Sequence, residues 1–243
     1  MCTGDTALVS GDAQVEVAAR VPGAAGLGLL VPPAARPLPA VRLADPAWTA
    51  GRLAELAERY RSDDRRVLAT VWWYSASSVL LTPPPAGLLT GHPLSARLAD
   101  TTLFELPGGV LVAATTTAGS GDVAGELRTS LAAVVAAVAE AGGMRPRPLW
   151  AIATDSLAGR LLALGRAVGD VPRATALAAE LAAAVGPPLP APGHVDVEGV
   201  RFVRRVSCCL LYRLPGQPLC ASCPRRPAAH REALLADTAA RMR

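Results

Sequence analysis

The chain has 243 residues, of which 51% are hydrophobic, so it is long enough and apolar enough to bury a sizeable core. Aromatic residues make up only 4%, and the net charge of +4 includes 24 basic residues, all of them Arg, spread along most of the chain. Nucleic-acid binding usually needs basic residues clustered with stacking aromatics, so this composition speaks against a nucleic-acid partner.

The N-terminal part of the chain shows no clear period. In residues 1–44, segment 13–19 partly alternates between apolar and polar residues, 26–31 is apolar, and Pro and Gly punctuate the rest. The first twenty residues include Asp5 and Asp12 and lack the basic start and apolar run of a secretory signal. We therefore expect a cytoplasmic protein whose thiols stay reduced.

Two helices are predicted next. Asp45 and Pro46 combine an N-cap residue with Pro at the first helical position, and apolar residues follow at helical spacing over about four turns. The stretch 67–81 is uncharged and contains Trp72 and Trp73. It is shorter than the ~20 residues that a membrane span needs. We therefore expect a buried core helix and no stable membrane insertion.

A small β-hairpin and three further helices are predicted in the middle of the chain. Segments 86–90, 101–106 and 110–115 are short, and Pro107-Gly108-Gly109 between the last two indicates a hairpin. Helices are predicted at 122–141, 149–164 and 172–185, and the last ends at a Gly followed by two Pro. The expected fold class is α+β, predominantly α-helical, with a small β-hairpin region.

One glycine-rich segment resembles a nucleotide-binding fingerprint in outline. Residues 119–124 fit G-x-G-x-x-A, but a polar stretch, 115–118, stands where the turn should be tight. The candidate acidic partner, Asp155, lies over thirty residues from the glycines and continues into helical spacing. Because the strand–helix–strand pattern is not sustained, we assign no nucleotide site here.

The composition divides the chain into three parts. A mostly helical domain, residues 1–185, is followed by a Pro-rich linker, residues 186–199, and a C-terminal module, residues 200–243. The module is predicted to begin with a short strand, 200–207, and to end with a helix that starts near Pro227.

Four of the five cysteines lie within sixteen residues of this module, at Cys208, Cys209, Cys220 and Cys223, whereas Cys2 stands alone. Disulfides are disfavoured, because no secretory signal is present and adjacent cysteines cannot bridge without strain. A structural zinc site fits the C-x2-C pair but not the adjacent pair. An iron–sulfur cluster of two irons uses two thiolates per iron, so its ligand pairs need not converge on one centre. Spacing alone makes the cluster the leading option and leaves zinc open.

The pattern C-C-x10-C-x2-C, here CCLLYRLPGQPLCASC, resembles the C-terminal motif of the ferric-siderophore reductases of the FhuF family. Pro224 after the last cysteine and the Arg-rich strand before the first are similar too, and a weaker resemblance extends upstream through Leu149-Trp150 and 155–164. The resemblance implies that the four cysteines ligate a 2Fe-2S cluster. It also implies one-electron reduction of a ferric siderophore with release of ferrous iron.

The implied partners are a ferric siderophore, bound by the helical domain, and an external electron donor of the ferredoxin or flavin reductase type. No catalytic residue is assigned beyond the cluster. Five arginines near the cysteines could raise the potential of a negatively charged cluster and attract anionic ferric complexes, or could be solvated surface charges. They are Arg204, Arg205, Arg213, Arg225 and Arg226.

Two other functions are compatible with the same residues. One is a siderophore-binding or chaperone-like protein whose four cysteines hold a structural zinc ion. The other is an iron or redox sensor that uses cluster loss as a switch, although no helix-turn-helix with a basic surface is evident.

Overall fold

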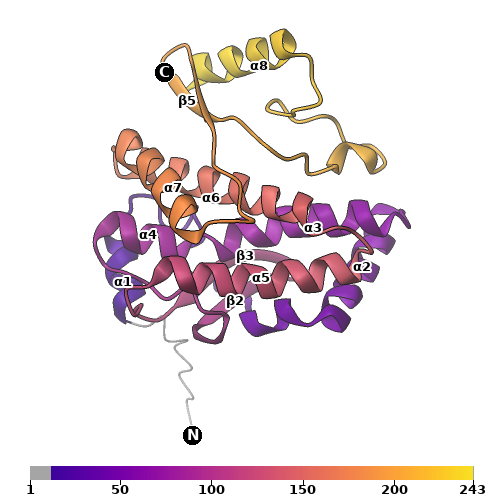
Figure 1. Cartoon of the computed structure of the whole chain (residues 1–243), viewed down its shortest axis with the longest axis horizontal. Coiled ribbons are helices and arrows are strands. Elements are labelled where there is room, and N and C mark those ends of the chain that lie inside the picture. Colours follow the sequence, from indigo (N-terminus) through magenta and orange to yellow (C-terminus); the bar gives the residue numbers. More distant parts are fainter. Residues whose placement is uncertain (1–11, 243) are drawn as a thin grey trace, which may run out of the picture.

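The computed structural model describes residues 12–242, and helices make up most of it (Figure 1). The α-helices are α1 (Asp12–Ala19), α2 (Pro46–Tyr60), α3 (Arg65–Leu80), α4 (Pro83–Thr90), α5 (Val123–Ala141), α6 (Arg147–Ala167), α7 (Val171–Val185) and α8 (Ala228–Arg241). Three 3-10 turns are η1 (Ala40–Ala44), η2 (Leu98–Asp100) and η3 (Leu211–Arg213). The strands are β1 (Arg36–Pro39), β2 (Thr101–Leu106), β3 (Val110–Thr116), β4 (His194–Val197) and β5 (Val200–Val203).

The predicted fold class, α+β with helices predominant, is confirmed. Over residues 12–242, no helix has the length and apolarity to cross a membrane.

The helices that were predicted from caps and spacing are present. Asp45 caps α2, because its carboxylate accepts hydrogen bonds from the backbone N–H groups of Ala47 and Trp48. The predicted core helix 67–81 corresponds to α3, whose start is capped by Asp64. The other three predicted helices are α5, α6 and α7, with ends that differ from the prediction by up to three residues.

The triple proline begins a helix rather than only ending one. Pro83, Pro84 and Pro85 form the first turn of α4, so the segment 86–90 is helical and not part of the short extended elements. Proline is tolerated in the first turn of a helix because the N–H groups there have no intrahelical partner. Helix α4 ends at Gly91, which has a φ of 77°.

The predicted hairpin is confirmed, and a third strand extends it. Strands β2 and β3 pair antiparallel across the turn at Pro107-Gly108-Gly109. Strand β1 pairs with the free side of β2, giving the order β1-β2-β3. The two prolines of β1 hid this strand from sequence analysis, and an edge strand is where a sheet tolerates proline.

Segment 13–19, which shows no clear period in sequence, is helical. One buried polar residue explains why the helical period is hidden. The side chain of Gln14 is buried in α1, where its amide donates to the backbone oxygens of Leu29 and Ala114. Its oxygen accepts from the N–H of Thr116. Gln14 thus satisfies a backbone group of Leu29 and two backbone groups of β3. This buried polar residue on the inner face of α1 interrupts the apolar spacing by which a helix is recognised.

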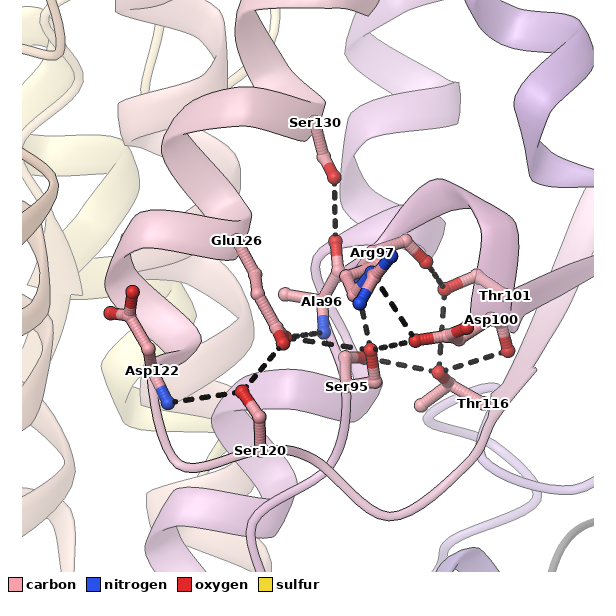
Figure 2. Close-up of polar contacts among 10 residues, drawn as sticks. All are labelled: Ser95, Ala96, Arg97, Asp100, Thr101, Thr116, Ser120, Asp122, Glu126 and Ser130. Carbon is pink, nitrogen blue, oxygen red and sulfur yellow. Dashed lines mark hydrogen bonds and ion pairs between the residues drawn. The ribbon is translucent and has the colours of Figure 1, made fainter.

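A polar junction joins the start of α5 to the loop before β2 (Figure 2). The Glu126 carboxylate accepts from the N–H of Ala96 at 2.9 Å and from the hydroxyl of Ser120 at 2.8 Å. Asp122 caps the helix by accepting from the N–H of Gly125. A Cβ at Gly119 would lie 2.8 Å from the backbone of Leu94, so close chain packing requires this glycine. The G-x-G-x-x-A segment therefore forms the capped start of α5. The carboxylates of Asp122 and Glu126 lie at this helix N-terminus, which is where a phosphate would bind in a nucleotide site.

Helices α3 and α6 form the platform on which the C-terminal segment lies. The indole N–H of the fully buried Trp73 donates to the backbone oxygen of Leu149 at 2.9 Å, and the hydroxyls of Ser77 and Ser156 are 2.7 Å apart. In Figure 1 the C-terminal segment, from orange to yellow, runs along this pair of helices on the side away from α5 and β2. The platform is therefore well placed to fix groups in that segment.

Candidate metal centre

The C-terminal segment begins with a hairpin of two short strands. Strands β4 and β5 pair antiparallel from His194↔Val203 to Val197↔Val200. The predicted linker 186–199 therefore includes a strand, and the predicted strand 200–207 has ladder pairing only as far as Val203. Beyond this point, residues 205–207 are held by α6 instead of by a neighbouring strand.

Asp155 of α6 makes those contacts. One of its carboxylate oxygens accepts from the N–H of Val206 at 2.9 Å. The other accepts from the N–H and the hydroxyl of Ser207, at 2.9 and 2.5 Å, and lies 3.5 Å from Nε of Arg205. The side chains of Asp155 and Arg205 are only 4% and 6% exposed, so this is a buried ion pair. A buried carboxylate is costly unless it is paired and hydrogen-bonded, and here it is both.

The chain turns sharply just after the adjacent cysteines. Leu210, which follows Cys209, has a φ of 59°, a left-handed conformation that residues with side chains rarely adopt. The 3-10 turn η3 follows directly and leads the chain away. A second tight turn spans the C-x2-C pair, where the N–H of Cys223 donates to the backbone oxygen of Cys220 at 3.2 Å.

The four cysteines of the module are all free thiols. Cys209 and Cys223 are buried, Cys208 is half-buried and Cys220 is exposed. Burial raises the pKa of Cys208, and its contacts with Cys223 and Cys209 raise that pKa further. Burial also raises the pKa of Cys220, whereas the positive charge of Arg205 lowers it. The thiols thus lie within electrostatic reach of one another. In residues 12–242, no three His, Cys, Asp or Glu side chains already converge on a single metal position.

Arg205 is a cation in direct contact with one of these sulfurs. Its Nη1 lies 3.6 Å from Sγ of Cys220, and its guanidinium carbon lies 4.8 Å from the centre of the Tyr74 ring. Burial alone would lower the pKa of Arg205, but attraction to Tyr74, Cys209, Asp155 and Cys220 raises it overall. Its Nη2 is buried and has no hydrogen-bond partner among the residues that the structure describes. A sulfur-rich anionic group held by the cysteines would supply an acceptor beside it, so the residues present fit a thiolate-bound cluster.

The other predicted arginines divide into two kinds. Arg226 closes the second cysteine turn, because its Nε and Nη2 donate to the backbone oxygens of Cys220 and Leu219 at 2.9 and 2.6 Å. The remaining three are exposed: Arg204 lines a cavity, Arg213 pairs with Asp64 at 3.6 Å, and Arg225 lies 5.9 Å from the Tyr212 ring. Arg205 and Arg226 therefore contact the cysteine loops directly, and the exposed three contribute to the surface charge around them.

Sequence reasoning missed Asp155, Tyr74 and Ser207 as members of this site. The sequence associates Asp155 with the acidic end of a nucleotide fold and with the upstream resemblance over 155–164, but not with the cysteines. Its signal was present, because it is the only acidic residue in the otherwise largely apolar α6. Its partner, however, lies fifty residues further along the chain, and no local pattern joins the two.

Comparison with known proteins bears on the same segment. Residues 205–225 match the family model described as the FhuF 2Fe-2S C-terminal domain. No curated protein and no solved structure matches the chain. The matched segment contains all four clustered cysteines, together with Arg205, Arg213 and Arg225. The segment with the four cysteines thus matches a 2Fe-2S cluster-binding domain, the cofactor that the cysteine pattern implied.

Proposed function

We propose that this protein reduces the ferric iron of a siderophore by one-electron transfer and so releases the iron. In this proposal, Cys208, Cys209, Cys220 and Cys223 ligate the cluster, and the helical domain, residues 1–185, receives the siderophore together with the C-terminal segment. The observation that carries the proposal is the match of the segment with four free thiols to a 2Fe-2S domain, together with the buried Arg205, whose Nη2 has no hydrogen-bond partner among residues 12–242.

Two cavities next to Arg205 are the candidate approach for substrate. One, of about 340 Å³, lies between the β4–β5 hairpin and α8, and its lining combines apolar side chains with the charged side chains of Arg204, Arg231, Asp196 and Glu232. The other, of about 320 Å³, lies between α6 and the C-terminal segment and is lined by Tyr74 and Asp155. Arg205 and Ser222 line both, so a ligand in either cavity would lie next to the second cysteine turn.

The bound cluster would supply a single electron at these cavities. A ferredoxin-type or flavin-type donor loses that electron, and the ferric ion of the siderophore complex gains it. No covalent bond is made in this step. Siderophores bind hard ferric iron, typically with oxygen donors, and the lower charge of ferrous iron weakens that binding. Ferrous iron and the free siderophore are the products.

The residues of this chain would position the reactants. The exposed Cys220 marks the side from which the sulfurs are nearest to solvent. The larger cavity is lined by three arginines and two carboxylates, which leaves an excess of positive charge. Positive charge near a redox centre raises the local concentration of anionic complexes and speeds their encounter. The buried Arg205 would stabilise the additional negative charge that arrives on reduction.

The test is the visible absorption spectrum of anaerobically purified protein before and after dithionite, with iron, sulfide and zinc measured on the same sample. Broad visible bands that bleach on reduction, with iron and sulfide in equal amounts, are expected. The reduced protein should then convert a ferric siderophore to ferrous iron, trapped by a ferrous chelator. A colourless protein that contains zinc would contradict the proposal and favour the structural zinc alternative. A cluster that reduces no ferric siderophore would favour the sensor.

A further inference from the structure

A single carboxylate of the helical domain receives the chain just before its adjacent cysteines. Asp155 accepts from the N–H groups of Val206 and Ser207, from the Ser207 hydroxyl, and pairs with Nε of Arg205. Ser207 immediately precedes Cys208. This carboxylate therefore sets the direction in which the chain enters the first cysteine pair.

The same carboxylate reaches the second cysteine pair through Arg205. The guanidinium of Arg205 lies between Asp155 on one edge and Sγ of Cys220 on another, with the Tyr74 ring against it. Its side chain is only 6% exposed, so it has little freedom to move. Asp155 thus contacts one cysteine loop directly and restrains the other through one intermediate.

The support beneath Asp155 is rigid. The next residue of α6, Ser156, shares a hydrogen bond with Ser77 of α3, and Trp73 of α3 is bonded to the backbone of α6. These contacts are all buried, and exchange with water does not weaken them. The backbone of Asp155 is therefore fixed by the helical domain, and its carboxylate extends from this rigid support to the C-terminal segment.

We propose that Asp155 is the positioning residue of the metal centre and holds both cysteine loops at the separation that their shared ligand requires. The proposal rests on the proposed set of four cysteine ligands. Residues that orient metal ligands through hydrogen bonds commonly change metal affinity by about 10–100-fold when they are replaced. Asp155 does this work from outside the matched segment 205–225.

The variant Asp155→Asn tests this role, because it keeps the shape of the side chain and removes its charge and one acceptor. We expect the holoprotein of this variant to lose iron to a strong chelator at least about tenfold faster than the wild type. Hydrogen exchange at the amides of Val206 and Ser207 should accelerate in the same sample. The melting temperature of the helical domain, followed by far-ultraviolet circular dichroism, should change little.

The matched control is Asp196→Asn. Asp196 also pairs with an arginine of the C-terminal segment, since its two oxygens lie 2.8 Å from Nε and Nη2 of Arg201. That pair is exposed and makes no hydrogen bond or ion pair with the four cysteines of residues 12–242. The control should release iron at the wild-type rate. If Asp155→Asn fails to fold, Ser207→Ala removes only the hydroxyl donor and should also release iron faster than the wild type.

Wild-type iron release and wild-type amide exchange in Asp155→Asn would overturn the proposal, as would an equal acceleration in Asp196→Asn. None of these measurements uses a siderophore. A wild-type protein that carries the cluster but reduces no ferric siderophore would therefore refute the proposed function and leave the role of Asp155 standing.

Discussion

At the scale of single residues, the five cysteines provide the most direct test of the ligand set. Cys209 is buried in the module and lies beside the other thiols, whereas Cys2 belongs to the part of the chain outside the described residues and has no partner in sequence. Replacing a thiolate ligand by a hydroxyl removes a soft sulfur donor that iron–sulfur clusters require. We expect Cys209→Ser to lose most of its bound iron and sulfide, and Cys2→Ser to retain both. Visible absorption and iron content, measured on both proteins, check this, and an intact cluster in Cys209→Ser would exclude that residue as a ligand.

The arginines around the cysteines are separable by burial. Neutralising Arg204 and Arg205 together should lower the cluster potential and slow the reduction of anionic ferric complexes. Because Arg205 is buried against Cys220 and Arg204 is exposed, we expect Arg205→Gln to cause nearly all of the fall in potential, on the order of 50–100 mV for a unit charge at an effective dielectric constant of about 20.

Arg204→Gln should leave the potential nearly unchanged and weaken only the salt-sensitive part of the reduction rate. Redox titration of the single and double variants checks both statements. A double variant with the wild-type potential and the wild-type reduction rate would show that these arginines act only as ordinary surface charges.

At the scale of elements, one glycine shows how tightly α4 packs. A Cβ at Gly87 would lie 2.6 Å from the backbone oxygen of His92 and 2.7 Å from the backbone nitrogen of Leu94, so the chain could not keep its path. We expect Gly87→Ala to lower the free energy of unfolding by about 1–3 kcal/mol, as overpacking commonly does.

Gly51 in α2 is the control, since no atom lies within 4 Å of a Cβ there. Gly51→Ala should raise the free energy of unfolding by up to about 1 kcal/mol, because alanine has the higher helix propensity. Urea unfolding followed by circular dichroism measures both. Equal stability of Gly87→Ala and the wild type would mean that α4 and the following loop are more loosely packed than the structure has them.

The sequence was most informative where structure is local. Caps such as Asp45, helical spacing and the Pro107-Gly108-Gly109 turn each act within a few residues, so α2, the β2–β3 hairpin and α5 to α7 could be predicted. Helix α1 and strand β1 could not, because what stabilises them lies far along the chain: Gln14 bonds to Ala114, and β1 pairs with β2. Tertiary contacts of this kind override local propensity.

The candidate site divides in the same way. The four cysteines are recognisable from their spacing because all of them lie in one short segment of chain. Asp155 and Tyr74 come from two different helices, fifty or more residues before Arg205, and only the packing of α3 on α6 brings them together. The sequence therefore predicts the candidate sulfur donors but not the buried groups that contact their loops.

At the scale of the whole molecule, charge is distributed unevenly. Residues 200–231 contain seven Arg and no Asp or Glu, although the net charge of the entire chain is only +4. Some of these charges are compensated, as in the pair of Arg201 with Asp196, but Arg204 and Arg225 are exposed. The segment that carries the cysteines therefore presents positive charge to solvent on a molecule whose remainder is slightly acidic, and this asymmetry favours an acidic partner.

The external electron donor is the partner for which this asymmetry has a measurable consequence. If an acidic ferredoxin-type protein docks near the exposed Cys220, its rate of electron delivery should fall as ionic strength rises, because salt screens the attraction between exposed charges. Arg225→Glu should slow delivery by about threefold or more at low salt and should reduce its salt dependence, since a charge at the rim of an interface acts mainly on association.

Arg36→Glu, a reversal at an exposed position on β1, is the matched control and should have little effect. Stopped-flow mixing with a reduced acidic ferredoxin at several salt concentrations measures both variants. Equal slowing by the two would mean that overall charge, and not a docking surface beside the cysteines, governs the encounter.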